Sequence, residues 1–467
     1  MIDSLRIHAG TEPGPLQHGE FVLYWMQGVT MRSRANFALN FAIDQANRLG
    51  APVLVYQGLR HDYPWASDRF HTFILESVVD LYHGFADRGI QYAFYLETRT
   101  EQANRGHSES PLIGLGRRAA LVVTDFFPTF IQPRQLKRLR DQLEAPVVAV
   151  DSATVVPMRL HAKEYLVARS IRPVLFEALV HQLYPVRNSE PTIGRSVEIP
   201  FDQPVGAATS ARDIATLVAG CDIDHTVAPS PTTRGGERAA RARLVDFVDH
   251  GLPRYDQRGD PNVAATSRLS AHLHFGTISI QEVLLTAQQA GPREHYAKFL
   301  DQALTWRELS YNHVYLNPKH RTMAAVPEWA RKELADHSDD PRPALYSDPD
   351  LEHGRTHDAL WNAAQRSLVR DGEIHNYVRM LWGKSVLMWT KDAAAALRIL
   401  EHLNHKYALD GRDPNSYGGI LWCFGKYDRP FYRRPIFGTV RYMSLTAAAK
   451  KFDVPAYVAR FAAIGAK

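Results

Sequence analysis

The chain is poor in cysteine, with only Cys221 and Cys423 among its 467 residues. Two cysteines so far apart provide neither a disulfide framework nor the clustered ligands of a zinc site, and we predict no metal site. A chain of this length can bury a large core without such crosslinks. The composition fits a reducing compartment, and we expect the protein to be cytoplasmic.

Long hydrophobic runs are also missing. No segment approaches the roughly 20 apolar residues that a membrane-spanning helix needs. The first residues lack the positive segment and apolar stretch of a signal peptide, and the chain has no internal repeat. We therefore expect no membrane partner, and we take the protein to be a monomer.

Neither sign of charge dominates the composition. Lysine and arginine number 55 against 50 aspartates and glutamates, which gives a formal net charge of +5. This mildly basic balance permits a polyanionic partner without requiring one. The length suggests two or three domains.

The first third of the chain alternates apolar runs with helical patterns such as Ser33–Leu49 and Phe70–Arg88. The expected strands are Phe21–Met26, Pro52–Tyr56, Ile90–Leu96, Ala119–Asp125 and Pro146–Val150. Continuous apolar strands between helices indicate a parallel sheet that is covered on both faces. We predict an α/β, Rossmann-like, doubly wound domain over residues 1–155. Its first strand is not followed by a G-x-G-x-x-G turn, which argues against an ordinary dinucleotide site.

Residues 156–235 form a predicted interdomain connector. It has helical patterns at Ala162–Arg169 and Pro173–Leu183, followed by a stretch rich in Pro, Thr, Ser and Gly. Residues 236–467 are almost entirely helical in pattern. The expected helices are Glu237–Gly251, Ser279–Ala290, Glu294–Asn312, His357–Asp371, Ile374–Trp389, Asp392–Leu409 and Ser444–Ala463. Between the last two, Asp410–Tyr442 is dense in Gly, Pro and Asp and predicts a structured loop without a regular helix.

Hydroxyl side chains gather in the segment Thr266–Ser270, shortly after Tyr255 and Arg258. Hydroxyls and exposed backbone N–H groups at a helix start suit a phosphate. The segment also fits an ordinary helix N-cap, and taken alone it favours that interpretation.

Tryptophans concentrate near Trp361, Trp382 and Trp389. The last two are seven residues apart and share one helix face. Closely spaced indoles can pass an electron hole, but tryptophans at helical spacing are also common in cores, and the two interpretations are about equal here.

Two further segments carry chemistry. Trp306 follows Asp301 and Gln302 by about one helical turn, a pattern that alone favours a surface helix with one buried indole. Farther on, basic residues alternate with aromatic rings, a mixture that suits nucleic acid. They are Arg429, Arg433, Arg434 and Arg441, with Phe431, Tyr432, Phe437 and Tyr442. The alternative is that these arginines pair with Asp428 or Asp413.

Together these segments resemble the photolyase/cryptochrome family, and most closely the class II cyclobutane pyrimidine dimer DNA photolyases. The resemblance extends over nearly the whole chain. Its motifs, in order, are LHFG (Leu273–Gly276), HNYVRM…W (His375–Trp382), DGRDPNSYGG (Asp410–Gly419) and WCFGKYDRP (Trp422–Pro430).

The resemblance implies a deoxyribodipyrimidine photo-lyase with an antenna-type α/β domain and an all-α domain that binds FAD. The antenna chromophore is not identified by the sequence. The implied FAD-binding residues are Tyr255, Thr266, Ser267, Arg268, Leu269, Ser270, Arg379, Asn404 and Asp410. Arg379 and Asp410 would form an ion pair beside the flavin, and Asn404 would approach its N5.

The resemblance also implies roles in repair. Trp382, Trp361 and Trp389 would carry electrons between the flavin and the surface. UV-damaged DNA would be the partner, with the dimer flipped out of the duplex. Trp306 and Trp422 would stack on the dimer, with Gln302 and Met380 beside it, while Arg429 and Arg441 hold the opened DNA. Reduced FAD would give the dimer an electron and then recover it.

Two departures from the family pattern stand out. Asp301-Gln302 occupies positions where these enzymes usually carry Glu-Glu, and the family's Met-Tyr-Trp reads Met380-Leu381-Trp382. An amide donates a hydrogen bond but cannot transfer a proton, so repair efficiency or lesion preference is in question.

Two other functions fit parts of the sequence. One is a cryptochrome-like flavin photoreceptor without efficient repair, which Gln302 favours. The other is a helical nucleic-acid-binding protein without flavin. Trp306 and Trp422 favour repair, as does an expected end of the chain at Lys467 without a long signalling extension.

Overall fold

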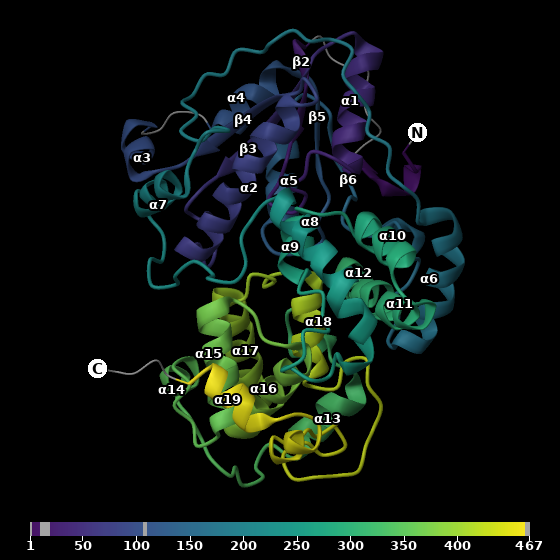
Figure 1. Ribbon diagram of the computed structural model, residues 1–467, viewed down its shortest axis with the longest axis vertical. Helices are drawn as coiled ribbons and strands as arrows, with labels where there is room; N and C mark the ends of the chain where they lie inside the picture. Colours follow the sequence, from purple (N-terminus) through teal and green to yellow (C-terminus); the bar gives the residue numbers. More distant parts are fainter. Residues whose placement is uncertain (1, 10–18, 106–109, 463–467) are drawn as a thin grey trace.

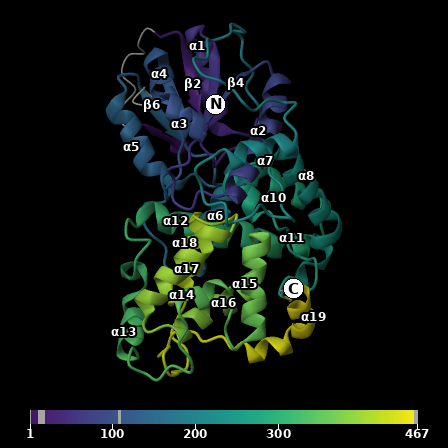
Figure 2. The same cartoon turned by 90° about the vertical axis from the view of Figure 1, so that its left-hand side faces the viewer.

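The computed structural model describes residues 2–9, 19–105 and 110–462. It has two tiers, an α/β tier built from the first part of the chain and a helical tier built from the last (Figure 1). The helices α8 to α12 form the part of the helical tier that lies next to the α/β tier, and the view turned by 90° shows the same stacking (Figure 2).

The α/β tier is built on a six-stranded sheet in the order β1-β6-β5-β2-β3-β4, parallel except for β1. Its strands are β1 (Ile7–Ala9), β2 (Phe21–Trp25), β3 (Val53–Leu59), β4 (Gln91–Leu96), β5 (Ala119–Asp125) and β6 (Val147–Val150). The five predicted strands and the doubly wound fold class are confirmed. The three-residue strand β1 was not predicted, because it is too short to carry a hydrophobic period.

Helices cover both faces of this sheet (Figure 1). They are α1 (Phe37–Leu49), α2 (Asp68–Ala86), α3 (Arg99–Arg105), α4 (Pro111–Arg118) and α5 (Gln132–Gln142). The first begins later than predicted because Asn36 caps it, accepting from the backbone N–H of Leu39. Ser33 lies outside this helix and donates from its backbone and hydroxyl to the carboxylate of Glu237, at 2.9 and 2.8 Å.

Residues 156–235, the predicted connector, contain α6 (Ala168–Gln182) and α7 (Ala211–Ala219). The predicted helix at Ala162–Arg169 is wrong, because Glu164 there is held by Lys426 and His313 in an irregular segment. The predicted helix start at Pro173 is also wrong, since this proline lies inside α6. The lost hydrogen bond is tolerated because Ile171 and Leu175 are buried on the inner face of that helix.

The helical tier contains α8 (Glu237–Asp246), α9 (Ser270–Phe275), α10 (Ile280–Ala290), α11 (Arg293–Leu300), α12 (Arg307–Leu316), α13 (Glu328–Asp336), α14 (Asp348–Glu352), α15 (Ala359–Asp371), α16 (Asn376–Trp389), α17 (Ala393–Tyr407), α18 (Pro414–Trp422) and α19 (Val454–Arg460). Wider π-helical turns at Phe247–Gly251 and Asp301–Trp306 extend α8 and join α11 to α12. None of the helices in the described residues combines the length and apolar character that crossing a membrane would require.

Helix α18 corrects the prediction that Asp410–Tyr442 has no regular helix. Pro414 sits in its first turn, where a missing N–H is harmless, and Asp413 caps it by accepting from the N–H of Asn415. Gly418 lets α18 approach α12, since a Cβ there would lie 2.3 Å from the hydroxyl of Ser310. The glycine therefore reflects close helix packing, which composition alone does not reveal.

The predicted final helix at Ser444–Ala463 is replaced by a 3₁₀ turn at Thr446–Lys450 and the short α19. Asp453 separates the two by capping α19, and it accepts from the N–H of Ala456 at 3.0 Å. The predicted end at Ala463 lies outside the described residues.

Buried charged side chains join the two tiers. Arg69 of α2 donates to the carbonyl oxygens of Tyr407 at 2.7 Å and Leu368 at 3.2 Å, near the ends of α17 and α15. Glu308 of α12 accepts from the backbone N–H groups of Val155 and Val156 at 2.5 and 3.2 Å. Such hydrogen bonds fix the helical tier, and its cavity, against the sheet.

Candidate functional site

A cavity of about 1240 Å³ opens in the helical tier. Its walls come from the segment before α9, the π turn at Asp301–Trp306, α16, α18 and the loop that follows α18. Single small-molecule sites usually measure about 300–1000 Å³. The volume therefore suits a large cofactor together with part of a second ligand.

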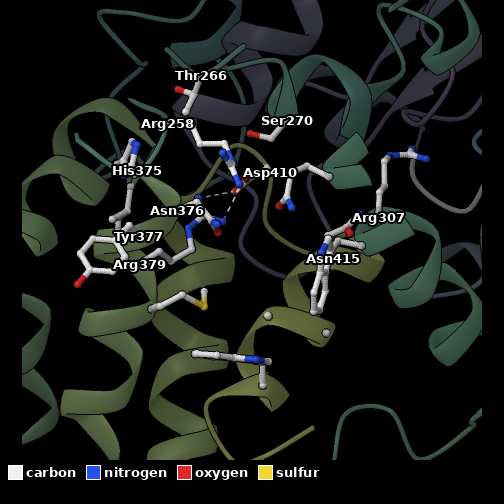
Figure 3. A pocket seen from close by; sticks show the side chains of 18 of the residues that line it. Arg258, Thr266, Ser270, Arg307, His375, Asn376, Tyr377, Arg379, Asp410 and Asn415 are labelled. Atoms are coloured by element: carbon white, nitrogen blue, oxygen red, sulfur yellow. Dashed lines mark hydrogen bonds and ion pairs between the residues drawn. The ribbon is translucent and has the colours of Figure 1, made fainter. Parts of the chain in front are cut away.

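Hydroxyl groups line one end of this cavity. Thr266 and Ser270 lie there close to Arg258 (Figure 3). The remaining predicted members of this group, Tyr255, Ser267, Arg268 and Leu269, also line the cavity. The backbone at Arg268 has a left-handed φ of 51°, an unusual conformation for a residue other than glycine. Its guanidinium is held by Glu373 at 2.8 Å.

An ion pair lies in the wall next to these hydroxyls. The two terminal guanidinium nitrogens of Arg379 each lie 3.1 Å from one carboxylate oxygen of Asp410, which makes the contact bidentate (Figure 3). Both side chains are mostly buried. The structure thus brings together the two residues predicted to pair, although they are 31 positions apart in sequence.

Asn404 does not line the main cavity. It lies in a small adjoining cavity of about 30 Å³ with Met380 and Trp382, and its amide donates to the hydroxyl of Ser416 at 3.1 Å. Met380 lines both cavities. The predicted approach of Asn404 to a flavin therefore remains a prediction.

The π turn forms another part of the wall. It carries Gln302 and Trp306, four residues apart, and both line the same cavity. Asp301 faces away and pairs with Arg172 of α6 at 2.8 Å. Asp301 therefore cannot replace a glutamate at the position of Gln302. Trp422 of α18 also lines this cavity.

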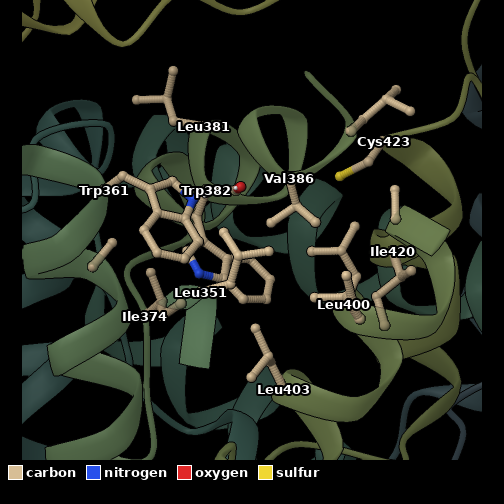
Figure 4. Close-up of a cluster of buried hydrophobic side chains, with 14 of the residues drawn as sticks. Leu351, Trp361, Ile374, Leu381, Trp382, Val386, Leu400, Leu403, Ile420 and Cys423 are labelled. Atoms are coloured by element: carbon tan, nitrogen blue, oxygen red, sulfur yellow. Dashed lines mark hydrogen bonds between the residues drawn. The ribbon is translucent and has the colours of Figure 1, made fainter. Parts of the chain in front are cut away.

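Three tryptophans, Trp361, Trp382 and Trp389, lie in the dry core of the helical tier. Figure 4 shows the first two. The rings of Trp361 and Trp382 stack with centroids 6.4 Å apart and planes 11° apart. Trp361 also meets the edge of Trp389, with centroids 5.6 Å apart. Trp361 therefore links the other two, in the predicted order.

The prediction that the series of tryptophans reaches the surface at Trp389 needs correction. Trp389 is only 1% exposed, because Tyr346 and His357 cover it with ring centroids at 5.5 and 5.1 Å. His357 is exposed, and its ring lies 2.5 Å from the hydroxyl of Tyr346. The path to solvent from Trp389 therefore runs through this tyrosine–histidine pair.

The indole N–H groups of the inner tryptophans have oxygen acceptors. Trp382 donates to the amide oxygen of Gln365 at 2.9 Å, and Trp361 donates to the carbonyl oxygen of Trp382 at 3.0 Å. A hydrogen bond to oxygen stabilises an indole that becomes positively charged. The geometry is suitable for moving a hole along the chain.

The two arginines predicted to hold DNA lie in different environments. Arg441 lines the cavity and forms a salt bridge to Asp428 at 2.7 Å, as the alternative interpretation of this loop expected. Arg429 lies outside the cavity wall and is exposed, with its guanidinium 5.6 Å from the ring of Phe431. Asp413 instead contacts His274 at 3.2 Å.

Several cavity residues were not predicted. Arg307 and His375 line it, and within the described residues one guanidinium nitrogen of Arg307 and both ring nitrogens of His375 are buried without a hydrogen-bond partner. Burial lowers the pKa of His375 to about 4, so its ring is neutral near pH 7. His375 is the first residue of the HNYVRM motif and Arg307 directly follows Trp306, but neither was predicted to have a role in the site.

No family model matches the chain. Individual proteins do match it over most of its length. The chain is 35% identical over 470 residues to a deoxyribodipyrimidine photo-lyase of Methanothermobacter thermautotrophicus, covering 98% of each protein. It is 32% identical to a deoxyribodipyrimidine photo-lyase of Arabidopsis thaliana, covering 94% of this chain and 88% of that one.

Solved structures agree on the fold. A class III photolyase from Agrobacterium tumefaciens aligns with a TM-score of 0.66 and 19% identity, over 97% of this chain and 88% of that chain. A Sulfolobus tokodaii photolyase solved with two FAD molecules aligns with a TM-score of 0.64 and 19% identity, over 95% and 90%. With an alignment that spans nearly the full length of relatives above 30% identity, the chain belongs to the photolyase family.

Proposed function

We propose that this protein binds FAD in the large cavity and uses light to split cyclobutane pyrimidine dimers in UV-damaged DNA. The observation that carries the proposal is one cavity whose wall combines two chemically different sets of groups. Hydroxyls and an ion pair form one set, and Gln302, Trp306 and Trp422 form the other. The relatives' name, deoxyribodipyrimidine photo-lyase, supports the same reaction.

The side chains present fit FAD. Thr266, Ser267 and Ser270 offer hydroxyl donors to phosphate oxygens, and the orphaned nitrogens of Arg307 and His375 offer further polar partners. Arg379 and Asp410 would face the polar edge of the flavin, and Met380 and Leu273 supply apolar contact. When bound, reduced FAD supplies the electron that light makes available.

The protein's own residues would bind and orient the lesion. Trp306 and Trp422 provide ring faces for the flipped-out dimer, and stacking on such rings tolerates any base. A dimer stacks poorly in the duplex, so flipping it out costs less than flipping a normal pair. The amide of Gln302 would donate a hydrogen bond to a dimer carbonyl but would not transfer a proton.

Arginines would hold the opened DNA. Arg429 is exposed and available for a phosphate, whereas Arg441 must share its charge with Asp428. The tryptophans Trp382, Trp361 and Trp389 would return the cofactor to its reduced state by passing an electron inward from the surface.

An absorption spectrum followed by a repair assay tests the proposal. The purified protein should show bound flavin and, under reducing conditions in light, should remove the dimer from a thymine-dimer oligonucleotide. Loss of the dimer in darkness, or its survival in light, would contradict the proposal. A colourless protein that still binds DNA would instead support a flavin-free nucleic-acid-binding protein.

Gln302 favours a second candidate, a cryptochrome-like photoreceptor that shares the flavin and tryptophan chain but repairs poorly. The two functions differ in the dark affinity for damaged DNA. A repair enzyme should prefer the dimer-containing duplex to the intact one, and a photoreceptor should bind both alike.

A further inference from the structure

A lysine is buried directly behind one of the cavity tryptophans. Lys384 of α16 is 1% exposed, and its ammonium lies 4.9 Å from the ring centroid of Trp422. It donates to the carbonyl oxygen of Cys423 at 2.8 Å, and Phe437 lies 5.9 Å away. Within the described residues, no carboxylate oxygen comes within 4.0 Å of this nitrogen.

Stability does not explain this lysine. Moving an ammonium out of water without a carboxylate partner is unfavourable, and an apolar side chain of the same shape would fill the site at lower cost. Burial lowers the pKa of Lys384 to about 8, which still leaves the group charged near pH 7. The structure therefore keeps a positive charge at the back of Trp422.

The other tryptophans around the cavity have no such neighbour. Within the described residues, no lysine or arginine lies over the ring of Trp306, Trp361, Trp382 or Trp389. Trp422 has two, because the guanidinium of Arg441 lies 5.7 Å from its centroid. The salt bridge of Arg441 to Asp428 offsets that second charge, so the unpaired cation is Lys384.

A cation on a ring face stabilises the neutral indole through its quadrupole and opposes positive charge on that same ring. Trp422 lines the cavity, so it competes with Trp382 as an electron donor to whatever oxidant the cavity holds. If Trp422 lost an electron, the ring that contacts the lesion would be damaged.

We infer that Lys384 is a positioning residue that directs electron loss to Trp382 and protects Trp422 from oxidation. The inference rests on the proposed FAD site. In the step concerned, an indole loses one electron to the photoexcited, oxidised flavin. The next indole refills it, and an external thiol finally supplies the electron. Lys384 raises the energy of the Trp422 radical cation and so prevents electron transfer from Trp422 to the flavin.

The test maps oxidised tryptophans in the flavin-loaded full chain. Wild type, Lys384→Met and Lys384→Gln are illuminated in air without DNA, and oxidation products at each tryptophan are measured by peptide mass spectrometry. Lys384→Gln keeps a donor for the Cys423 carbonyl and removes the charge. In both variants the ratio of Trp422 to Trp306 oxidation should rise by roughly tenfold or more. Lys391→Met, an exposed lysine just beyond the same helix, should leave the ratio unchanged.

A second measurement uses the Trp382→Phe background, in which the inner chain is broken. There, electron paramagnetic resonance should detect a light-induced radical on Trp422 only when Lys384 is also neutral. An unchanged Trp422 to Trp306 ratio in both variants, with normal oxidation along the inner chain, would overturn this inference alone. Wild-type protein with flavin but no light-driven indole oxidation would overturn the proposed function and this inference with it.

Discussion

Two groups of tryptophans surround the same region of the helical tier and differ in nearly every physical respect. Trp361, Trp382 and Trp389 are at most 2% exposed, and Trp361 contacts both of the others. Trp361 and Trp382 pack among aliphatic side chains (Figure 4). Trp306 and Trp422 are partly exposed and face an open cavity. The inner group has no cation over its rings in the described residues, and Trp422 has two.

The difference shows how environment, more than residue type, determines what an indole can do. Rings in mutual contact in a dry core can exchange charge, but no DNA can reach them. Rings on a cavity wall can stack on a base, yet a nearby cation makes Trp422 a poor electron donor. Substitutions in the inner group should therefore impair flavin photoreduction, and substitutions in the cavity group should impair binding of dimer-containing DNA.

The largest effect is expected from Trp382→Phe. Trp382 is the inner tryptophan that borders both the small cavity and Trp361, so its loss should slow flavin photoreduction by orders of magnitude. Dark binding of dimer-containing DNA should stay unchanged, because Trp382 is buried away from the cavity wall. Transient absorption and a binding titration measure the two effects. Photoreduction at the wild-type rate would show that Trp382 is not part of the electron-transfer path.

Lys384→Met should change the pH dependence of stability. The folded-state pKa of Lys384 is about 8 against an ordinary 10.5, so between these values the unfolded state binds more protons. Wild-type stability should therefore rise with pH from 8 to 10.5, by up to about 3 kcal/mol from this group. The variant should be the more stable protein near pH 7, and its advantage should shrink over that range.

Urea unfolding at several pH values checks this expectation. Lys391→Met is again the matched control, because that lysine is exposed. Equal pH slopes in wild type and Lys384→Met would mean that the folded protein does not lower the pKa of Lys384, because its ammonium is solvated or well paired in solution. Such a result would also weaken the contrast between Trp422 and the inner tryptophans.

Trp306→Ala tests the cavity group. Loss of one stacking ring should weaken dark binding of dimer-containing DNA by about 1–3 kcal/mol, a roughly five- to 150-fold rise in Kd. Photoreduction without DNA should continue, because Trp306 does not contact the inner chain in the described structure. An unchanged affinity for the dimer together with slow photoreduction would reverse the roles assigned to the two groups.

The sequence predicted some parts of the molecule better than others. The strands β2 to β6 were predictable because each is a continuous apolar run between helical patterns. The order Trp382–Trp361–Trp389 followed from helical spacing and the family resemblance. Helix α18 was missed, because its proline and glycines suggest a loop until its packing against α12 is known.

Other features depend on contacts between distant segments and were beyond sequence reasoning. Asp301 pairs with Arg172 while its neighbour Gln302 lines the cavity, and no composition signals the π turn that carries both. Lys384 looks like a surface lysine in sequence, and the residues that bury it lie almost 40 positions later. Trp389 is shielded from solvent by Tyr346 and His357, which belong to none of the motifs found in the sequence.

Gln302→Glu should have the smallest effect and concerns only the cavity group. Gln302 lines the cavity one π turn before Trp306, so a carboxyl there would face the same ligand. The amide of Gln302 only donates a hydrogen bond, whereas a protonated carboxyl donates one and can also transfer its proton. An effect of about 1 kcal/mol corresponds to a roughly fivefold gain in dimer repair per absorbed photon. The gain should grow as the pH falls, because protonation of the new carboxyl supplies the donor.

The control for this substitution is Asp301→Asn, which removes a carboxylate that faces Arg172 and not the cavity. It should leave the repair yield per photon unchanged, and both variants should photoreduce like wild type because neither touches the inner tryptophans. No gain from Gln302→Glu at any pH would mean that the amide suits the lesion this protein recognises. A loss of photoreduction in Gln302→Glu would instead show that the two groups are coupled through the cavity, contrary to the separation that their burial and contacts indicate.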